Sequence, residues 1–177
     1  MILLVSGLSG AWAERYSSLL ADRVGVLVTP RGWHKPTTIL ANACHWAMDN
    51  DCFGGLDARR FRTCLARWRS VTPGPKFVAV PDVMGHAAAT LRLFDEWEPV
   101  IHGHGFPAAL VLQDGLDPAR VPWHRVEAVF VGGTTGYKLS DDAYRVCQEA
   151  RRQGKWVHMG RGNSRRPPSR PTTSSST

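Results

Sequence analysis

The strongest constraint on the fold is an alternation of short apolar runs with longer amphipathic stretches over the first 160 residues. Each apolar run ends in glycine, proline or a polar residue, and the stretches between them have helical spacing. Neighbouring parallel strands need crossover connections, so this alternation predicts a parallel α/β sheet with helices outside it. Seven strands are predicted, at Met1–Val5, Gly25–Thr29, Trp46–Met48, Phe77–Val80, Ala108–Leu112, Ala128–Val131 and Trp156–Met159.

Helices are expected in the stretches between these strands. Within Leu56–Ser70, the apolar residues Phe61, Leu65 and Trp68 recur at helical spacing, and Asp57 suits the N-cap position. The other expected helices are Ala13–Asp22, Pro36–Ala43, Ala87–His102 and Asp141–Gln153.

Seven strands fit either a doubly wound sheet or a (β/α)8 barrel. The positions of the polar residues favour the barrel, because the carboxyl ends of its strands converge on one face. The Rossmann fingerprint is missing, since Ala13 stands where a third glycine would follow Gly7 and Gly10, and no acidic residue ends the second strand. The polar residues at strand ends are Asp49, Asp82, Gln113, Asp114, Gly132 and Gly133.

The predicted barrel is incomplete at its C-terminus. A whole barrel typically takes about 250 residues, and the pattern stops before a final strand and helix. Residues 161–177 contain no aliphatic, aromatic or cysteine side chain, so we expect a disordered basic Pro/Ser/Thr tail after a single domain at 1–160.

Charge and composition narrow the class of protein. The chain of 177 residues carries +7, of which four tail arginines supply +4, so the domain carries +3. This balance suits a polyanionic partner without specifying one. No apolar window is long enough for a membrane span and no signal peptide is recognisable, so we expect a soluble, cytoplasmic protein. Four cysteines without zinc-finger spacing predict free thiols: Cys44, Cys52, Cys64 and Cys147.

Three strand ends carry candidate binding residues. Asp82 follows a proline at the end of an apolar strand, and its alternative role is to cap the next helix. Gln113 and Asp114 repeat that arrangement one unit later, with an Asx turn as the alternative. The pair Gly132 and Gly133 lets backbone amides approach a ligand, or simply permits a tight turn.

A fourth strand end concentrates two carboxylates and an amide in the segment Asp49–Phe53. Asp49 suits a general acid/base role beside a polar pocket, and Phe53 suits a stacking face for a planar ring. The alternative is an ordinary polar surface loop.

Five blocks in one order resemble the guanine transglycosylases, the queuine tRNA-ribosyltransferase superfamily of TIM barrels. The closest resemblance is to the branch that inserts 7-deazaguanine bases into DNA, and it covers about residues 1–161. The blocks are WAMDNDCF, FVAVPDV, LVLQDG, VFVGGTTGYKL and VHMGR.

The resemblance implies roles for individual residues. The carboxylate at Asp49 would act as acid or base beside the reacting sugar, and Phe53 would lie on the base. Asp82 and Gln113 would hydrogen-bond the guanine edge. Gly132 and Gly133 would give backbone contacts, and Met159 would pack on the other ring face.

The implied reaction is base exchange at C1′ of a nucleotide, with a carboxylate nucleophile and a covalent intermediate, as in a retaining glycosidase. The sequence departs from the family here. The family's nucleophilic aspartate lies on the strand after the block with Met159, whereas Glu149 is the last acid of the sequence. We therefore expect a truncated or frameshifted member, which binds the base without turnover unless Asp51 or Asp114 replaces the nucleophile.

The expected partners are DNA or tRNA and a guanine or 7-deazaguanine base, with a homo-oligomer as a further possibility and no membrane. No cofactor and no metal are expected. Two other interpretations stay open: a non-catalytic module that binds purine or nucleic acid, and an unrelated TIM-barrel enzyme.

Overall fold

The computed structural model describes residues 1–6, 15, 23–32 and 45–160. The helices expected at 13–22 and 36–43, Cys44, the glycines at 7 and 10, and the tail 161–177 lie outside these residues. The described part is a mixed α/β structure whose seven strands form one sheet. They are β1 Leu3–Val5, β2 Val24–Val28, β3 His45–Met48, β4 Val78–Ala79, β5 Ala108–Leu112, β6 Ala128–Val131 and β7 Trp156–Met159.

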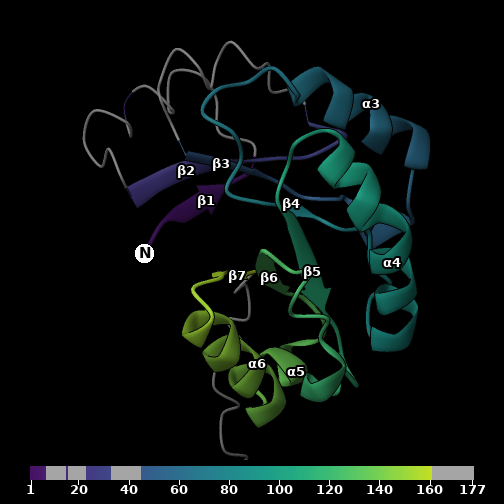
Figure 1. Ribbon diagram of the computed structural model, residues 1–177, viewed down its shortest axis with the longest axis vertical. Coiled ribbons are helices and arrows are strands. Elements are labelled where there is room, and N and C mark those ends of the chain that lie inside the picture. Colours follow the sequence, from purple (N-terminus) through teal and green to yellow (C-terminus); the bar gives the residue numbers. More distant parts are fainter. Residues whose placement is uncertain (7–14, 16–22, 33–44, 161–177) are drawn as a thin grey trace, which may run out of the picture.

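All seven strands are parallel, and each pairs with its sequence neighbours. A doubly wound sheet requires a point at which the strand order reverses. The order β1-β2-β3-β4-β5-β6-β7 has no such reversal. The sheet curls into a half-barrel (Figure 1). The predicted strands, their parallel pairing and the barrel-like arrangement are thus confirmed, while closure into a full eight-stranded barrel is not seen among the described residues.

Three long helices cover the outside of the sheet (Figure 1). They are α3 Ala58–Trp68, α4 Ala87–Gly103 and α6 Asp141–Arg152. Asp57 caps α3 by accepting a hydrogen bond from the Arg60 amide, as the sequence predicts. The sequence did not predict the short helix α5 Thr135–Lys138 or the 3-10 turns η2 Cys52–Gly54 and η3 Pro118–Arg120.

The core has two layers because successive strand residues point to opposite faces of the sheet. The outer layer, between the sheet and the helices, contains the large buried side chains Trp46, Phe61, Trp68 and Trp97. The inner layer is smaller and built on Leu4, Ala47, Phe77, Ala109 and Ala128. Ile2, Leu27, Phe130 and Trp156 pack against this inner layer.

Close strand packing explains one glycine of the sheet. A Cβ on Gly25 would lie 2.3 Å from the backbone oxygen of His45 and 2.8 Å from the Leu4 side chain. Only glycine lets β2 lie this close to both neighbours.

Candidate functional site

The carboxyl ends of β3 to β6 surround a cavity of about 420 Å³. Because these strands are parallel, the polar residues that follow them meet at one edge of the sheet. Six of the seven residues singled out from the sequence line this cavity: Asp49, Phe53, Asp82, Gln113, Gly132 and Gly133.

Asn50 organises the first part of the site. Its side chain is 5 % exposed, and its Nδ2 donates to the Val80 carbonyl at 2.8 Å and to Asp82 Oδ1 at 2.6 Å. Its Oδ1 accepts from the Cys52 amide at 2.8 Å, which shapes the turn after β3. This one amide therefore ties the end of β3 to the end of β4.

Gln113 holds Asp82 from the other side. Its Nε2 donates to Asp82 Oδ2 at 2.6 Å, and its Oε1 accepts from the Gly85 amide at 2.8 Å. Asp82 does not cap the next helix, since the N-cap of α4 is His86. The two amides leave further lone pairs on the Asp82 carboxylate, which can accept more hydrogen bonds from a ligand.

The two carboxyl groups of the site are hard to ionise together. Burial raises the pKa of Asp49 above its ordinary value, the Asn50 amide opposes this, and the charge of Asp82 adds to the rise. Burial also raises the pKa of Asp82, against the hydrogen bonds from Asn50 and Gln113. A carboxyl group with a raised pKa can carry a proton to a reacting group near neutral pH.

Asp51 and Cys52 follow on the same loop and line the same cavity. Asp51 has φ 57°, in the left-handed region that Asp and Asn tolerate better than most residues. Its Oδ2 is buried without a hydrogen bond and lies 3.7 Å from Nε of Arg31. Burial raises the pKa of Cys52 to about 11, so this side chain stays a neutral thiol.

The glycine pair and Asp114 shape the floor of the site. A Cβ on Gly132 would lie 2.8 Å from Gln113 Nε2, and Gly133 has φ +73°. The Asp114 carboxylate accepts from the Thr134 amide and hydroxyl, and these bonds outweigh desolvation and hold its pKa below the usual value. Asp114 thus stabilises the segment that follows β6 as well as its own turn. It does not line the cavity.

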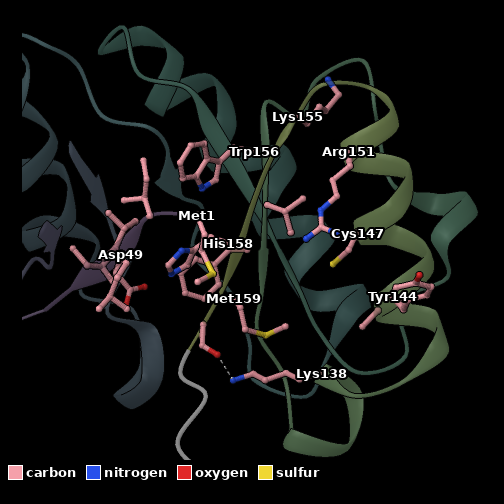
Figure 2. Close-up of a pocket in the computed structure, with 18 of the residues that line it drawn as sticks. Met1, Asp49, Lys138, Tyr144, Cys147, Arg151, Lys155, Trp156, His158 and Met159 are labelled. Carbon is pink, nitrogen blue, oxygen red and sulfur yellow. Dashed lines mark hydrogen bonds between the residues drawn. The ribbon is translucent and has the colours of Figure 1, made fainter. Parts of the chain in front are cut away.

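A second, larger cavity of about 1370 Å³ lies beside the first, and Asp49 lines both. Leu3 and Leu4 of β1 line it, and Figure 2 shows side chains of β7 and α6 on its walls. Met159, the seventh residue singled out from the sequence, lines this cavity and is 50 % exposed, while Phe53 is 83 % exposed. The two proposed ring-stacking residues therefore do not face each other across one closed pocket.

His158 projects into the larger cavity from β7 (Figure 2). Its ring packs against Phe77 and Phe130 at centroid distances of 5.2 and 4.9 Å. Burial lowers the pKa of His158 to about 4, so the ring is neutral at physiological pH.

Sequence reasoning missed three residues of the site. Asn50 is the organising amide, Phe130 gives the smaller cavity an apolar wall, and Lys138 lines both cavities while its Nζ donates to the Gly160 carbonyl at 2.8 Å (Figure 2). The available signal for Asn50 was its position directly after a predicted strand, between two carboxylates. Phe130 lies within an apolar strand, and nothing in the sequence pattern separates it from core residues.

Within the described ranges, no three His, Cys, Asp or Glu side chains are grouped so as to hold a metal ion. The described helices are all too short or too polar to cross a membrane. Neither models of known protein families nor curated proteins give a match to this chain.

Proposed function

We propose that this half-barrel is an incomplete (β/α)8 barrel of guanine transglycosylase type, which exchanges guanine for a 7-deazaguanine base in DNA, with tRNA as the other candidate substrate. The observation that carries the proposal is the Asp82 carboxylate, fixed by Asn50 and Gln113 at the wall of the 420 Å³ cavity. The proposal is supported further by the order of the five sequence blocks and by their meeting at one edge of the sheet.

The chemistry of guanine suits a fixed carboxylate. The ring N1–H and the exocyclic amino group form a pair of neighbouring donors, which one carboxylate can accept together. Adenine lacks this pair and would leave the remaining lone pairs of Asp82 without two matching donors in a desolvated site. Val111 and Phe130 offer apolar surface to a planar ring in the same cavity.

The exchange needs one nucleophile and one proton carrier. A carboxylate oxygen would bond to C1′ as the C1′–N9 bond breaks, and the bonding electron pair would leave with guanine. Asp49, whose raised pKa favours its protonated form, would give a proton to the departing base and accept the N9 proton of the incoming one. Asp51 is the candidate nucleophile, because it lines the cavity and its Oδ2 has no hydrogen bond, whereas Asp114 is bonded to Thr134 and does not line the cavity.

The test is incorporation of labelled guanine into duplex DNA and into tRNA. Asp82→Asn places an amide donor against the two donors Asn50 and Gln113, so we expect a loss of at least about tenfold. Asp51→Asn keeps the left-handed backbone conformation and removes the nucleophile, so we expect no exchange. Asp117→Asn, at an exposed cap, should exchange at the wild-type rate.

Calorimetry with free guanine, 7-deazaguanine and adenine separates the catalytic protein from the binding module. Binding of the first two bases without exchange would favour the non-catalytic purine-binding module. Equal binding of adenine, or no binding of any of the three bases, would overturn the assignment of Asp82.

A further inference from the structure

The positive charge of the described domain is concentrated on one helix. Residues 57–69 hold five arginines and one acid, for a charge of +4, while the remainder of residues 1–160 holds thirteen basic and fourteen acidic residues, for −1. The arginines are Arg59, Arg60, Arg62, Arg67 and Arg69, on α3 and at its C-cap.

All five arginines lie on the solvent side of α3. The helix buries Phe61, Cys64, Leu65 and Trp68 against the sheet. The other positions from Ala58 to Arg69 are exposed, and besides arginine they hold only Ala58, Thr63 and Ala66. The outer face of α3 is therefore mainly basic. The helix lies on the outside of the half-barrel (Figure 1).

Few of these charges are neutralised within the described part of the chain. Arg60 lies 3.6 Å from Asp57, and the guanidinium of Arg62 lies over the Trp97 ring at 4.5 Å. Arg59, Arg67 and Arg69 enter no ion pair among the described residues, whereas Arg145 and Arg152 on α6 each pair with an acid.

We propose that the outer face of α3 docks the phosphate backbone of duplex DNA. The planar guanidinium group of arginine can donate two hydrogen bonds to one phosphate, which the ammonium group of lysine does less well. All five basic residues here are arginine. Eleven helical residues span about 16 Å, over which a duplex presents several phosphates. The proposal rests on the proposed function for the choice of DNA.

The side chains on this face argue against other anionic partners. It exposes no aromatic residue on which unpaired bases could stack, so it suits a duplex rather than a single strand. It exposes no large apolar residue that could enter a lipid surface, as membrane-bound helices do.

The position of α3 connects this surface to the candidate site. Asp49 to Phe53 line the 420 Å³ cavity, and residues 54–57 alone separate Phe53 from the first residue of the helix. The N-terminal end of α3 is therefore the end nearer to the cavity along the chain, and a duplex that lies along α3 would approach the cavity there.

The experiment compares two triple variants of equal net charge by fluorescence anisotropy on a labelled 20-base-pair duplex at several salt concentrations. Arg59→Gln/Arg67→Gln/Arg69→Gln should weaken binding about tenfold or more and make the slope of log affinity against log salt shallower by about 2 to 3. Arg92→Gln/Arg145→Gln/Arg152→Gln, three exposed arginines on α4 and α6, should bind within about twofold of wild type, since these side chains lie outside the proposed surface. If the circular dichroism of the α3 triple variant departs from that of the wild type, the single variant Arg67→Gln replaces it, with an expected slope change of about 0.9.

Equal weakening by both triples would overturn the proposal, since net charge alone would then explain binding. The proposal would also be overturned if the α3 triple kept its binding to DNA and lost binding only to vesicles containing phosphatidylserine, or only to tRNA. If DNA binds through α3 but no guanine is exchanged, the proposed function is refuted and the docking proposal stands. If guanine is exchanged but the α3 triple binds DNA as the wild type does, the docking proposal is refuted and the proposed function stands.

Discussion

Single buried polar side chains decide the geometry of the candidate site. Asn50 and Gln113 have no charge, yet their amides hold both oxygens of Asp82 at 2.6 Å. Buried amides must find partners, because an unpaired donor costs about 1–3 kcal/mol. The positions of Asp82 and of the turn after β3 therefore follow from these two residues.

Asp49→Asn should change the pH dependence of stability. Burial raises the pKa of Asp49 above 3.8 in the folded protein, so the folded state binds this proton more tightly than the unfolded chain. Wild-type stability is therefore lost at this group as the pH rises from about 4 through the raised pKa. The variant keeps an oxygen for the Asn50 amide and should gain in urea midpoint relative to wild type between pH 4 and pH 8. The same gain in the exposed-site variant Asp117→Asn would contradict this.

His158→Phe should protect the protein from acid. The pKa of His158 is lowered by burial from 6.5 to about 4, so its contribution is fully present above pH 6.5 and is lost as the pH falls toward 4. Phenylalanine preserves the packing on Phe77 and Phe130 without the ionisable group, and should remove about 2 to 3 kcal/mol of acid destabilisation by pH 4. Urea titrations at pH 4, 5 and 7 measure this, with the exposed-site variant His124→Gln as control. A wild-type pH profile in the variant would be evidence against a buried neutral ring.

At the scale of elements, α4 is anchored by an ionic cluster near its C-terminal end. Glu98 is 7 % exposed, accepts from Arg125 at 2.7 Å and contacts His102 at 2.7 Å. His102 also bridges to Glu127 at 3.1 Å, whose side chain accepts from the Ala108 amide at the start of β5. Local sequence gives no indication of this role for His102, because Glu98 and Glu127 become visible as its partners only once the fold is known.

Glu98→Gln should destabilise the fold by about 1–3 kcal/mol, since it removes a buried charge-assisted acceptor from two donors. Glu96→Gln, on the exposed side of the same helix, should stay within about 0.5 kcal/mol of wild type. Chemical denaturation at pH 7 measures both variants. Similar values for the two would show that the cluster adds no more than a surface charge does.

The ends of β5 and β6 depend on close packing at a glycine. A Cβ on Gly132 would lie 2.8 Å from both Gln113 Nε2 and Val111 Cγ1. Gly132→Ala should therefore cost about 1–3 kcal/mol and weaken guanine binding through displacement of Gln113. Gly74→Ala, where a Cβ meets nothing within 4 Å, is the matched control in thermal melts and calorimetry. Unchanged guanine binding in Gly132→Ala would show that Gln113 does not contribute to base recognition.

At the scale of the whole molecule, the half-barrel has two edges. Within the described ranges, β1 pairs only with β2 and β7 pairs only with β6, and the larger cavity lies between these edges. Unpaired strand edges beside apolar surface promote association between chains. Leu3 on β1 is 63 % exposed.

We expect concentration-dependent self-association of the isolated chain, visible as a mass that rises with loading in size-exclusion chromatography with light scattering. Leu3→Lys should shift the protein toward the monomer, because a charge on an edge strand opposes pairing. Val83→Lys, at an exposed apolar position away from β1 and β7, should leave the association unchanged. A sharp monomer peak at every concentration, with a cooperative melt, would contradict the expectation.

The sequence by itself determined the elements. Apolar runs and their periodicity predicted all seven strands and the helices α3, α4 and α6, because burial on one or both faces must be written into local residue order. Convergence of Asp49, Asp82, Gln113 and the glycine pair also followed, because carboxyl ends of parallel strands share one edge. Only the tertiary structure decided which side chains contact one another, such as Asn50 with Asp82 and Asp114 with Thr134. It also decided that Phe53 and Met159 are exposed. Such contacts join residues some 20 to 32 positions apart, and they depend on sheet curvature and register, which local patterns do not encode.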